Sequence, residues 1–190
     1  MNLPKRNKTA LFFCWLTGFL MLPLLAIALP DDRNQPIEIQ ADSAERDAKT
    51  GVTTYTGNVD IKQGSIHIAA STVTLKTDKN DELSTVIATG GPARYEQQIS
   101  GPDDKVEALG STIHYQIQQD LITLQQNASL EQKGTTIKGE RIEYDVKAEK
   151  VKASGAQKGS TDNSKRITVV IPPSKKKTDT SSDKKTQGAD

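Results

Sequence analysis

The stretch YTGNVDIKQGSIHIAA, from Tyr55 to Ala70, carries the clearest strand pattern of this chain. Apolar residues and glycine occupy every second position before the Gln63-Gly64 pair, and apolar residues do so again after it. Strict alternation puts one set of side chains on one face of a β-strand, and a glycine-containing pair between two such runs is typical of a hairpin. The stretch therefore predicts two antiparallel strands that share an apolar face.

The same alternation extends in both directions and covers the chain from Ile37 to Ile171. Turn signals interrupt it about every ten residues, as expected for many short antiparallel strands in a sandwich or roll. No stretch has a convincing helical period. The fold class is therefore all-β. The turns are expected at Thr50-Gly51, Gln63-Gly64, Asp78–Asp81, Gly90–Pro92, Gly101–Asp104 and Lys133-Gly134.

An internal repeat appears when the sequence is shifted by 69 residues, which places Asn58 on Asn127. At this shift the alternating positions of the two copies coincide, for example Ile68 with Ile137 and Val73 with Ile142. Two independent domains of this size would each be near the lower limit for a stable core. The repeat therefore predicts one continuous stack of strands with a shared interior.

The N-terminus has the three parts of a secretory signal peptide. Positive residues come first, an apolar run extends from Ala10 to about Leu25, and Ala26 and Ala28 stand where signal peptidase recognises small residues. Cleavage is expected after Ala28, and a retained membrane anchor is the alternative. The expected domains are a signal peptide (1–28), an extended polar segment (29–36), the β domain (37–171) and a disordered Lys-rich tail (172–190).

Removal of residues 1–28 takes away every Phe, Trp, Met and Cys of the chain and changes its formal charge from +1 to −2. The remaining 162 residues cannot form an internal disulfide or supply a catalytic thiol, and their near-neutral charge argues against nucleic-acid binding. His67 and His114 lack partners at metal-ligand or catalytic spacing. We therefore expect no enzyme, no cofactor and no metal site.

Four pieces of the sequence resemble the OstA-like domain family of lipopolysaccharide-transport proteins. These are NQPIEIQAD from Asn34, YTGNVDIKQGSIHIAA from Tyr55, GSTIHY from Gly110 and TIKGERIEY from Thr136. The resemblance covers nearly all of the exported chain. It implies a single open-ended, twisted β-jellyroll of antiparallel strands whose interior receives the acyl chains of lipopolysaccharide.

The resemblance also implies a location, a task and partners. The location is the periplasm, and the task is moving lipopolysaccharide from the inner to the outer membrane for outer-membrane assembly. Besides lipopolysaccharide, the implied partners are an inner-membrane-anchored jellyroll subunit, the N-terminal jellyroll of the outer-membrane translocon, and further copies of the chain joined end to end.

Site residues are carried over from the family at matching positions. Lipid contacts are implied for the first strand and for deeper interior positions, namely Ile37, Ile39, Tyr95, Tyr115 and Ile117. Alternation before Pro172-Pro173 independently suggests a last edge strand, and unpaired edges are templates for adding a strand from another chain. The implied docking residues at the two edges are Ile37, Ile39, Ile167, Val169 and Ile171.

Composition by itself favours a simpler interior, in which β-branched and small residues merely fill a core; the resemblance reverses that preference. Two other functions remain open. One is an exported β-scaffold that binds only proteins. The other is a related, membrane-anchored subunit of the same pathway, which would keep its N-terminal segment.

Overall fold

The computed structural model describes residues 32–101, 104–155 and 166–173. The expected signal peptide with Ala26 and Ala28, and the tail from residue 174 onward, lie outside these residues. The elements are η1 (Asp32–Asn34), β1 (Ile37–Gln40), β2 (Ser43–Asp47), β3 (Val52–Gln63), β4 (Ile66–Thr77), β5 (Leu83–Gln98), β6 (Lys105–Gln116), η2 (Ile117–Gln119), β7 (Leu121–Gln132), β8 (Thr135–Asp145), β9 (Lys150–Ser154) and β10 (Thr168–Val170).

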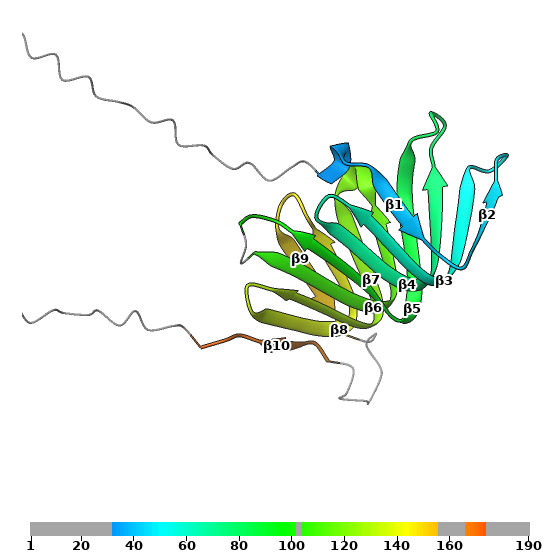
Figure 1. Ribbon diagram of the computed structural model, residues 1–190. Helices are drawn as coiled ribbons and strands as arrows, with labels where there is room; N and C mark the ends of the chain where they lie inside the picture. Colours follow the sequence, from blue (N-terminus) through cyan, green and yellow to red (C-terminus); the bar gives the residue numbers. More distant parts are fainter. Residues whose placement is uncertain (1–31, 102–103, 156–165, 174–190) are drawn as a thin grey trace, which may run out of the picture.

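The strands form one antiparallel sheet in the order β1-β3-β4-β5-β6-β7-β8-β10 (Figure 1). Strand β2 also pairs with β3, and β9 also pairs with β8, so each long terminal strand carries two short edge strands. From β3 to β8 each strand pairs with the next one along the chain, because short turns connect antiparallel neighbours. The prediction of an all-β, open-ended roll of antiparallel strands is confirmed.

A row of β-bulges crosses the sheet at mid-strand. The register shifts between Thr56 and Val59 in β3, and at the corresponding place in each following strand to β7. A bulge bends its strand, so an aligned row folds the whole sheet along one line. The halves on either side form two facing layers. We call the layer that contains β2 and β9 the first layer, and the layer that contains β1 and β10 the second.

The sequence repeat corresponds to a repeated pair of bent strands. The 69-residue shift carries Val52–Gln63 of β3 onto Leu121–Gln132 of β7. It also carries Asn58 (φ 43°) onto Asn127 (φ 55°), and both lie in the bulge. Asparagine tolerates this left-handed conformation better than most residues, which explains its use at both bends.

The core lies between the two layers and is built from the alternating apolar positions. It contains no Phe, Trp or Met among the described residues; its largest fully buried side chains are Tyr95 and Tyr144, followed by Ile113, Ile122, Leu124, Leu130 and Ile142. Burial of a Leu or Ile side chain contributes about 1.5–3 kcal/mol, so this aliphatic interior is the main source of stability.

Candidate functional site

Two tyrosines face each other across the interior. Tyr95 comes from the second-layer half of β5 and is 0% exposed, while Tyr115 comes from the first-layer half of β6 and is 6% exposed. Their rings meet edge to face with centroids 5.9 Å apart. Burial raises the pKa of both hydroxyls, most strongly that of Tyr95. Both tyrosines therefore stay neutral and offer an apolar ring with one polar end.

A small cavity of about 20 Å³ lies at the N-terminal end of this interior. Such a volume holds about one water molecule, so the two layers are packed against each other. Its lining is almost wholly aliphatic: Ile37, Ile61, Gln63, Ile66, Ile68, Leu75, Leu83, Val86, Tyr115 and Ile117.

The structure brings together the five residues that the resemblance implied for lipid contact. Ile37, Tyr115 and Ile117 line the small cavity, and Tyr95 touches Tyr115. Ile39 is half-buried and packs against the same core. They occupy one continuous apolar region that runs from the first edge strand into the interior. Their contact with lipid stays a prediction.

The two edges of the sheet carry the exposed large apolar side chains of the described residues. At the first edge this is Ile37, which is 40% exposed. At the last edge they are Ile167 (50%), Val169 (49%), Val170 (56%) and Ile171 (74%). Among the described residues β1 pairs only with β3 and β10 only with β8, so each leaves backbone groups available to another strand.

A polar segment that the sequence marked only as extended closes one side of the interior. Leu29–Asp31 lies outside the described residues. Asp32–Asn34 forms one turn of 3-10 helix, η1, in which Asp32 is buried. The Asp32 carboxylate accepts hydrogen bonds from the Ser65 backbone N–H (2.6 Å), the Ser65 hydroxyl (2.8 Å) and Gln97 Nε2 (2.9 Å).

Sequence reasoning missed this contact because one aspartate in a polar stretch carries no signal of burial. The only hint lies in the Gly64-Ser65 turn, against which Asp32 packs. Gly64 has φ +58°, and a Cβ built on it would lie 3.0 Å from the Asp32 Cα. A glycine was thus needed both for the turn and for the close approach of η1.

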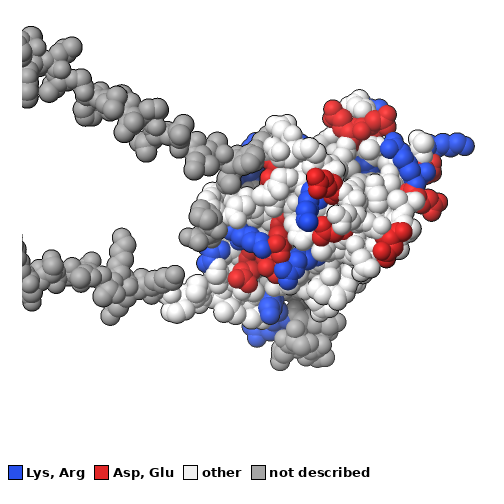
Figure 2. Space-filling model, in the orientation of Figure 1, with Lys and Arg blue, Asp and Glu red and all other residues white. Residues whose placement is uncertain are grey.

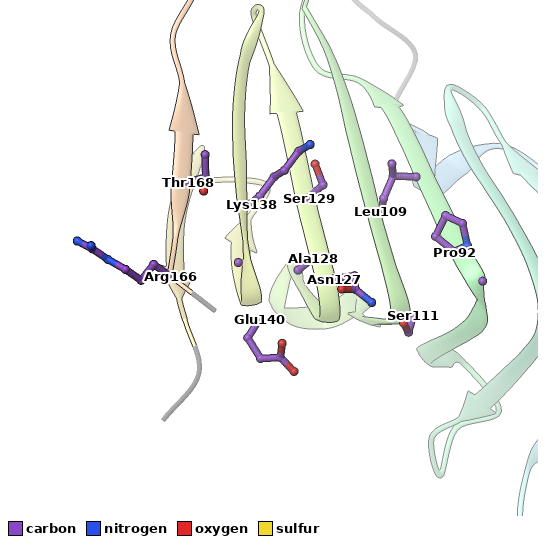
Figure 3. A pocket seen from close by; sticks show the side chains of 12 residues that line it. Pro92, Leu109, Ser111, Asn127, Ala128, Ser129, Lys138, Glu140, Arg166 and Thr168 are labelled. Atoms are coloured by element: carbon purple, nitrogen blue, oxygen red, sulfur yellow. The ribbon is translucent and has the colours of Figure 1, made fainter. Parts of the chain in front are cut away.

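The outer face of the sheet carries a separate open groove of about 820 Å³ (Figure 3). It lies between the bulge of β5 at Pro92 and strand β10 at Thr168, and it contains none of the five implied lipid-contact residues. Its side chains are mixed, with Leu109 beside Ser129, Lys138 and Glu140. Elsewhere on this surface, positive and negative side chains are interspersed over the face shown in Figure 2.

His67 and Asp78 make local hydrogen bonds. His67 Nε2 lies 2.5 Å from Asp60 Oδ2, and this hydrogen bond lowers the pKa of the Asp60 carboxyl. Asp78 closes the β4–β5 turn by accepting from the N–H groups of Asn80 and Glu82. Within residues 32–101, 104–155 and 166–173 no group of three or more metal-ligating side chains comes together. The same residues include no helix with the length and apolar character needed to span a membrane.

Fold and interior together define an open-ended antiparallel β-jellyroll with an apolar interior and two free, apolar edges. Residues 38–150 match the family model described as "LptA/(LptD N-terminal domain) LPS transport protein". The chain belongs to this family.

Individual relatives agree with this assignment. The chain is 46% identical over 154 residues to the lipopolysaccharide export system protein LptH of Pseudomonas aeruginosa, an alignment that covers 80% of this chain and 87% of the relative. It is 36% identical over 172 residues to lipopolysaccharide export system protein LptA of Escherichia coli K12, covering 90% and 89%. The crystal structure of LptH, a periplasmic component of the lipopolysaccharide transport device of P. aeruginosa, superposes with a TM-score of 0.68 at 44% identity, covering 76% of this chain and all of that one.

Proposed function

We propose that this chain is a periplasmic carrier that moves lipopolysaccharide from the inner to the outer membrane, with the acyl chains held between the two layers of the roll. The observation that supports it best is the coincidence of an apolar interior with a sheet that stays open at both ends. An interior that reaches both edges offers a lipid a route through the protein as well as a resting place.

The chemistry of the interior suits an acyl chain. Each buried methylene contributes about 0.8 kcal/mol, so a chain of a dozen carbons gains on the order of 10 kcal/mol by staying out of water. The interior presents aliphatic side chains and three buried tyrosines, Tyr95, Tyr115 and Tyr144. The buried Asp32 carboxylate at its margin is held by three hydrogen bonds. The large free energy of transfer also means that each carrier must pass the lipid directly to the next apolar trough.

The edges supply the means for that transfer. We propose that β1, with Ile37 and Ile39, and the last edge, with Ile167, Val169 and Ile171, add strands from neighbouring jellyrolls. The neighbours would be the inner-membrane-anchored subunit, the N-terminal jellyroll of the outer-membrane translocon, and other copies of this chain. Exposed apolar residues at both edges support this arrangement, because a carrier that worked alone would gain nothing by exposing them.

Residues 1–28 and 172–190 complete the proposal as a cleaved signal peptide and a Lys-rich tail. On this view the chain reaches the periplasm by secretion and acts without catalysis, cofactor or metal. The mass of the exported protein decides between cleavage after Ala28 and a retained anchor, because the two forms differ by the whole of the N-terminal segment.

Photo-crosslinking in cells tests the lipid site. A photoreactive amino acid at Tyr115 or Ile39 should form an adduct with lipopolysaccharide. The matched controls are His114 and Glu38, the preceding positions in the same strands, whose side chains point to the other face. Adducts at the inward positions alone support the proposal. A folded protein without lipid adducts at Tyr115 and Ile39, but with protein adducts at the edges, would instead indicate a scaffold that binds only proteins.

A further inference from the structure

Acyl chains cannot enter the interior while the two layers are packed as they are. The interior leaves a free volume of about 20 Å³ at its mouth, which is far less than one acyl chain needs. Because the row of bulges joins the layers on one side, they can separate only on the other, where the hairpin turns of the two layers face each other. We call this line between the two rows of turns the seam.

The turn η1 is attached to the second layer beside the seam. Asp32 accepts its three hydrogen bonds from Ser65, in the β3–β4 turn, and from Gln97, at the end of β5. Gln63 adds two more contacts, since its Nε2 lies 3.3 Å from the Arg33 carbonyl oxygen and 3.2 Å from that of Gln35. All of these groups belong to the tips of second-layer strands.

Arg33 reaches from the same turn to the first layer. Its Nη2 donates a hydrogen bond to the Ile117 carbonyl oxygen at 2.8 Å and pairs with the Asp120 carboxylate. Ile117 and Asp120 lie in the turn between β6 and β7, on the opposite side of the seam. Two successive residues, Asp32 and Arg33, therefore hold the tips of opposite layers together.

The anchors of η1 are connected to the residues that line the interior. Tyr95 donates its hydroxyl hydrogen to Gln97 Oε1 at 2.7 Å, and the same Gln97 side chain donates to Asp32. On the other layer, the residue that accepts from Arg33 is Ile117, whose side chain lines the small cavity. A molecule that pushes Tyr95 or Ile117 aside would disturb the contacts of η1 directly.

We propose that η1 is a strap across the seam, and that its release controls the entry of acyl chains into the interior. The inference rests on the proposed function, because it concerns access to the same lipid site. The strap is built to be released. It is held by polar contacts and consists of three polar residues, and the Arg33 and Asp120 side chains are 43% and 22% exposed. Segments held in this way open at much lower cost than the core.

The strap also lies where docking could act on it. β1, the proposed docking edge, begins only three residues after Asn34 (Figure 1). Further along the seam, Lys133 Nζ and Glu149 Oε2 form another ion pair between the layers at 3.7 Å, but both side chains are about half exposed. That longer, solvated pair is weaker than the contacts of η1, which form the stronger polar connection between the layers.

The strap can be tested without lipid by measuring access to the interior. Val86, which is 6% exposed and lines the small cavity, is replaced by cysteine in the full-length chain that also carries Cys14→Ser, so that one thiol reports on opening. Loss of a charged hydrogen-bond partner should raise the open population about tenfold. Arg33→Ala should therefore speed maleimide labelling of Val86→Cys about tenfold. The control Arg94→Ala removes an arginine of similar exposure, whose ion pairs lie on the outer face, and should leave the rate unchanged. Equal rates for Arg33→Ala and Arg94→Ala would overturn the strap.

The link to lipid entry is tested by locking the seam. In the Cys14→Ser chain, Arg33→Cys and Asp120→Cys are joined by a bis-methanethiosulfonate reagent, which a reducing agent later removes. The control joins Asp78→Cys to Gln118→Cys, whose native side chains also touch (3.2 Å) but lie on one side of the seam. With lipid A in detergent micelles, the Arg33–Asp120 lock should slow uptake at least tenfold, and reduction should restore it. Unchanged uptake in the locked protein would refute control of entry by the strap. Failure of the unmodified chain to take up lipid A at all would refute the proposed function, and Val86→Cys labelling would still decide the strap.

Discussion

Gly57 is the residue at which β3 bends, and replacing it with alanine should be costly for two separable reasons. Its φ of +84° disfavours any residue with a Cβ, at about 1 kcal/mol. A Cβ built on it would also lie 2.7 Å from the Asp42 Cβ, so Asp42 would have to move. Asp42 lies between β1 and β2, where its N–H donates to the Gly57 carbonyl oxygen at 3.0 Å and its carboxylate accepts from Asn58 Nδ2 at 3.3 Å.

The expected loss for Gly57→Ala is about 2–4 kcal/mol. The backbone term contributes about 1 kcal/mol, and the disturbed hydrogen bonds of Asp42 contribute about 0.5–1.5 kcal/mol each. Two other glycines separate the terms. Gly101 has φ +62°, and a Cβ added there would meet no described atom within 4 Å, so Gly101→Ala should lose only the backbone term. Gly91 has neither a positive φ nor a neighbour within 4 Å, so Gly91→Ala should be neutral or slightly stabilising.

Urea unfolding followed by far-UV circular dichroism measures the loss of unfolding free energy in each of the three variants. The dependence of that free energy on urea concentration should be the same in all of them, as two-state unfolding requires. Adding Asp42→Gly to Gly57→Ala removes the crowded side chain and should recover part of the loss. If Gly57→Ala costs no more than Gly101→Ala, Asp42 moves freely and the packing of the first edge against the bend is not important. A loss that Asp42→Gly does not reduce would place the cause elsewhere.

Three further outcomes are expected. The buried Tyr144 hydroxyl has no hydrogen-bond partner among the described residues, and burial raises its pKa to about 12. Tyr144→Phe should therefore leave the melting temperature unchanged or higher. Tyr95→Phe loses the hydrogen bond to Gln97 and should lower the free energy of unfolding, measured by the same thermal unfolding, by about 1 kcal/mol. The pKa of Asp104 is lowered by hydrogen bonding from Ser100 and by Lys133. The contribution of Asp104 to stability is therefore full above the unfolded-state pKa near 4 and is lost as the pH falls through the lower folded-state pKa. Asp104→Asn should flatten the acid limb of a pH–stability curve, and an unchanged limb would contradict this role of Asp104. Val169→Lys at the last edge should abolish end-to-end association, measured by light scattering, without changing monomer stability. Thr168→Lys on the outer face is the control and should leave association intact. Association that survives Val169→Lys would exclude this edge as the contact.

Several features of the fold could be predicted from local sequence alone. Alternation from Tyr55 to Ala70 corresponds to the β3–β4 hairpin, and its turn is Gly64-Ser65, one residue later than the expected Gln63-Gly64 pair. The 69-residue shift aligned Val52–Gln63 of β3 with Leu121–Gln132 of β7, which are equivalent strands in the structure. These features are readable because side-chain alternation and turn chemistry depend on neighbours within a few residues.

The candidate site was only partly accessible in this way. The alternation placed Tyr115 on an inward face, but its contact with Tyr95 depends on the fold along the row of bulges. The family resemblance supplied Ile37, Ile39, Tyr95, Tyr115 and Ile117 as a set, and the structure shows that they occupy one apolar region. A bulge adds one residue to a strand and leaves no strong signature in a single sequence, so the alignment of five bulges was not predictable.

A strand-rich, repeated chain with an aliphatic interior and an apolar last edge could thus be predicted from the residues alone, because hydrophobic alternation is a local property. The bend of the sheet into two packed layers and the position of the small cavity at one end are visible first in the tertiary structure. The tertiary structure also places Asp32 and Arg33 at the seam. Asp32 meets Ser65, which is 33 residues away along the chain, and Arg33 meets Ile117, which is 84 residues away. Contacts over such separations depend on where the bent strands bring their turns, and a short polar segment carries no local record of that position.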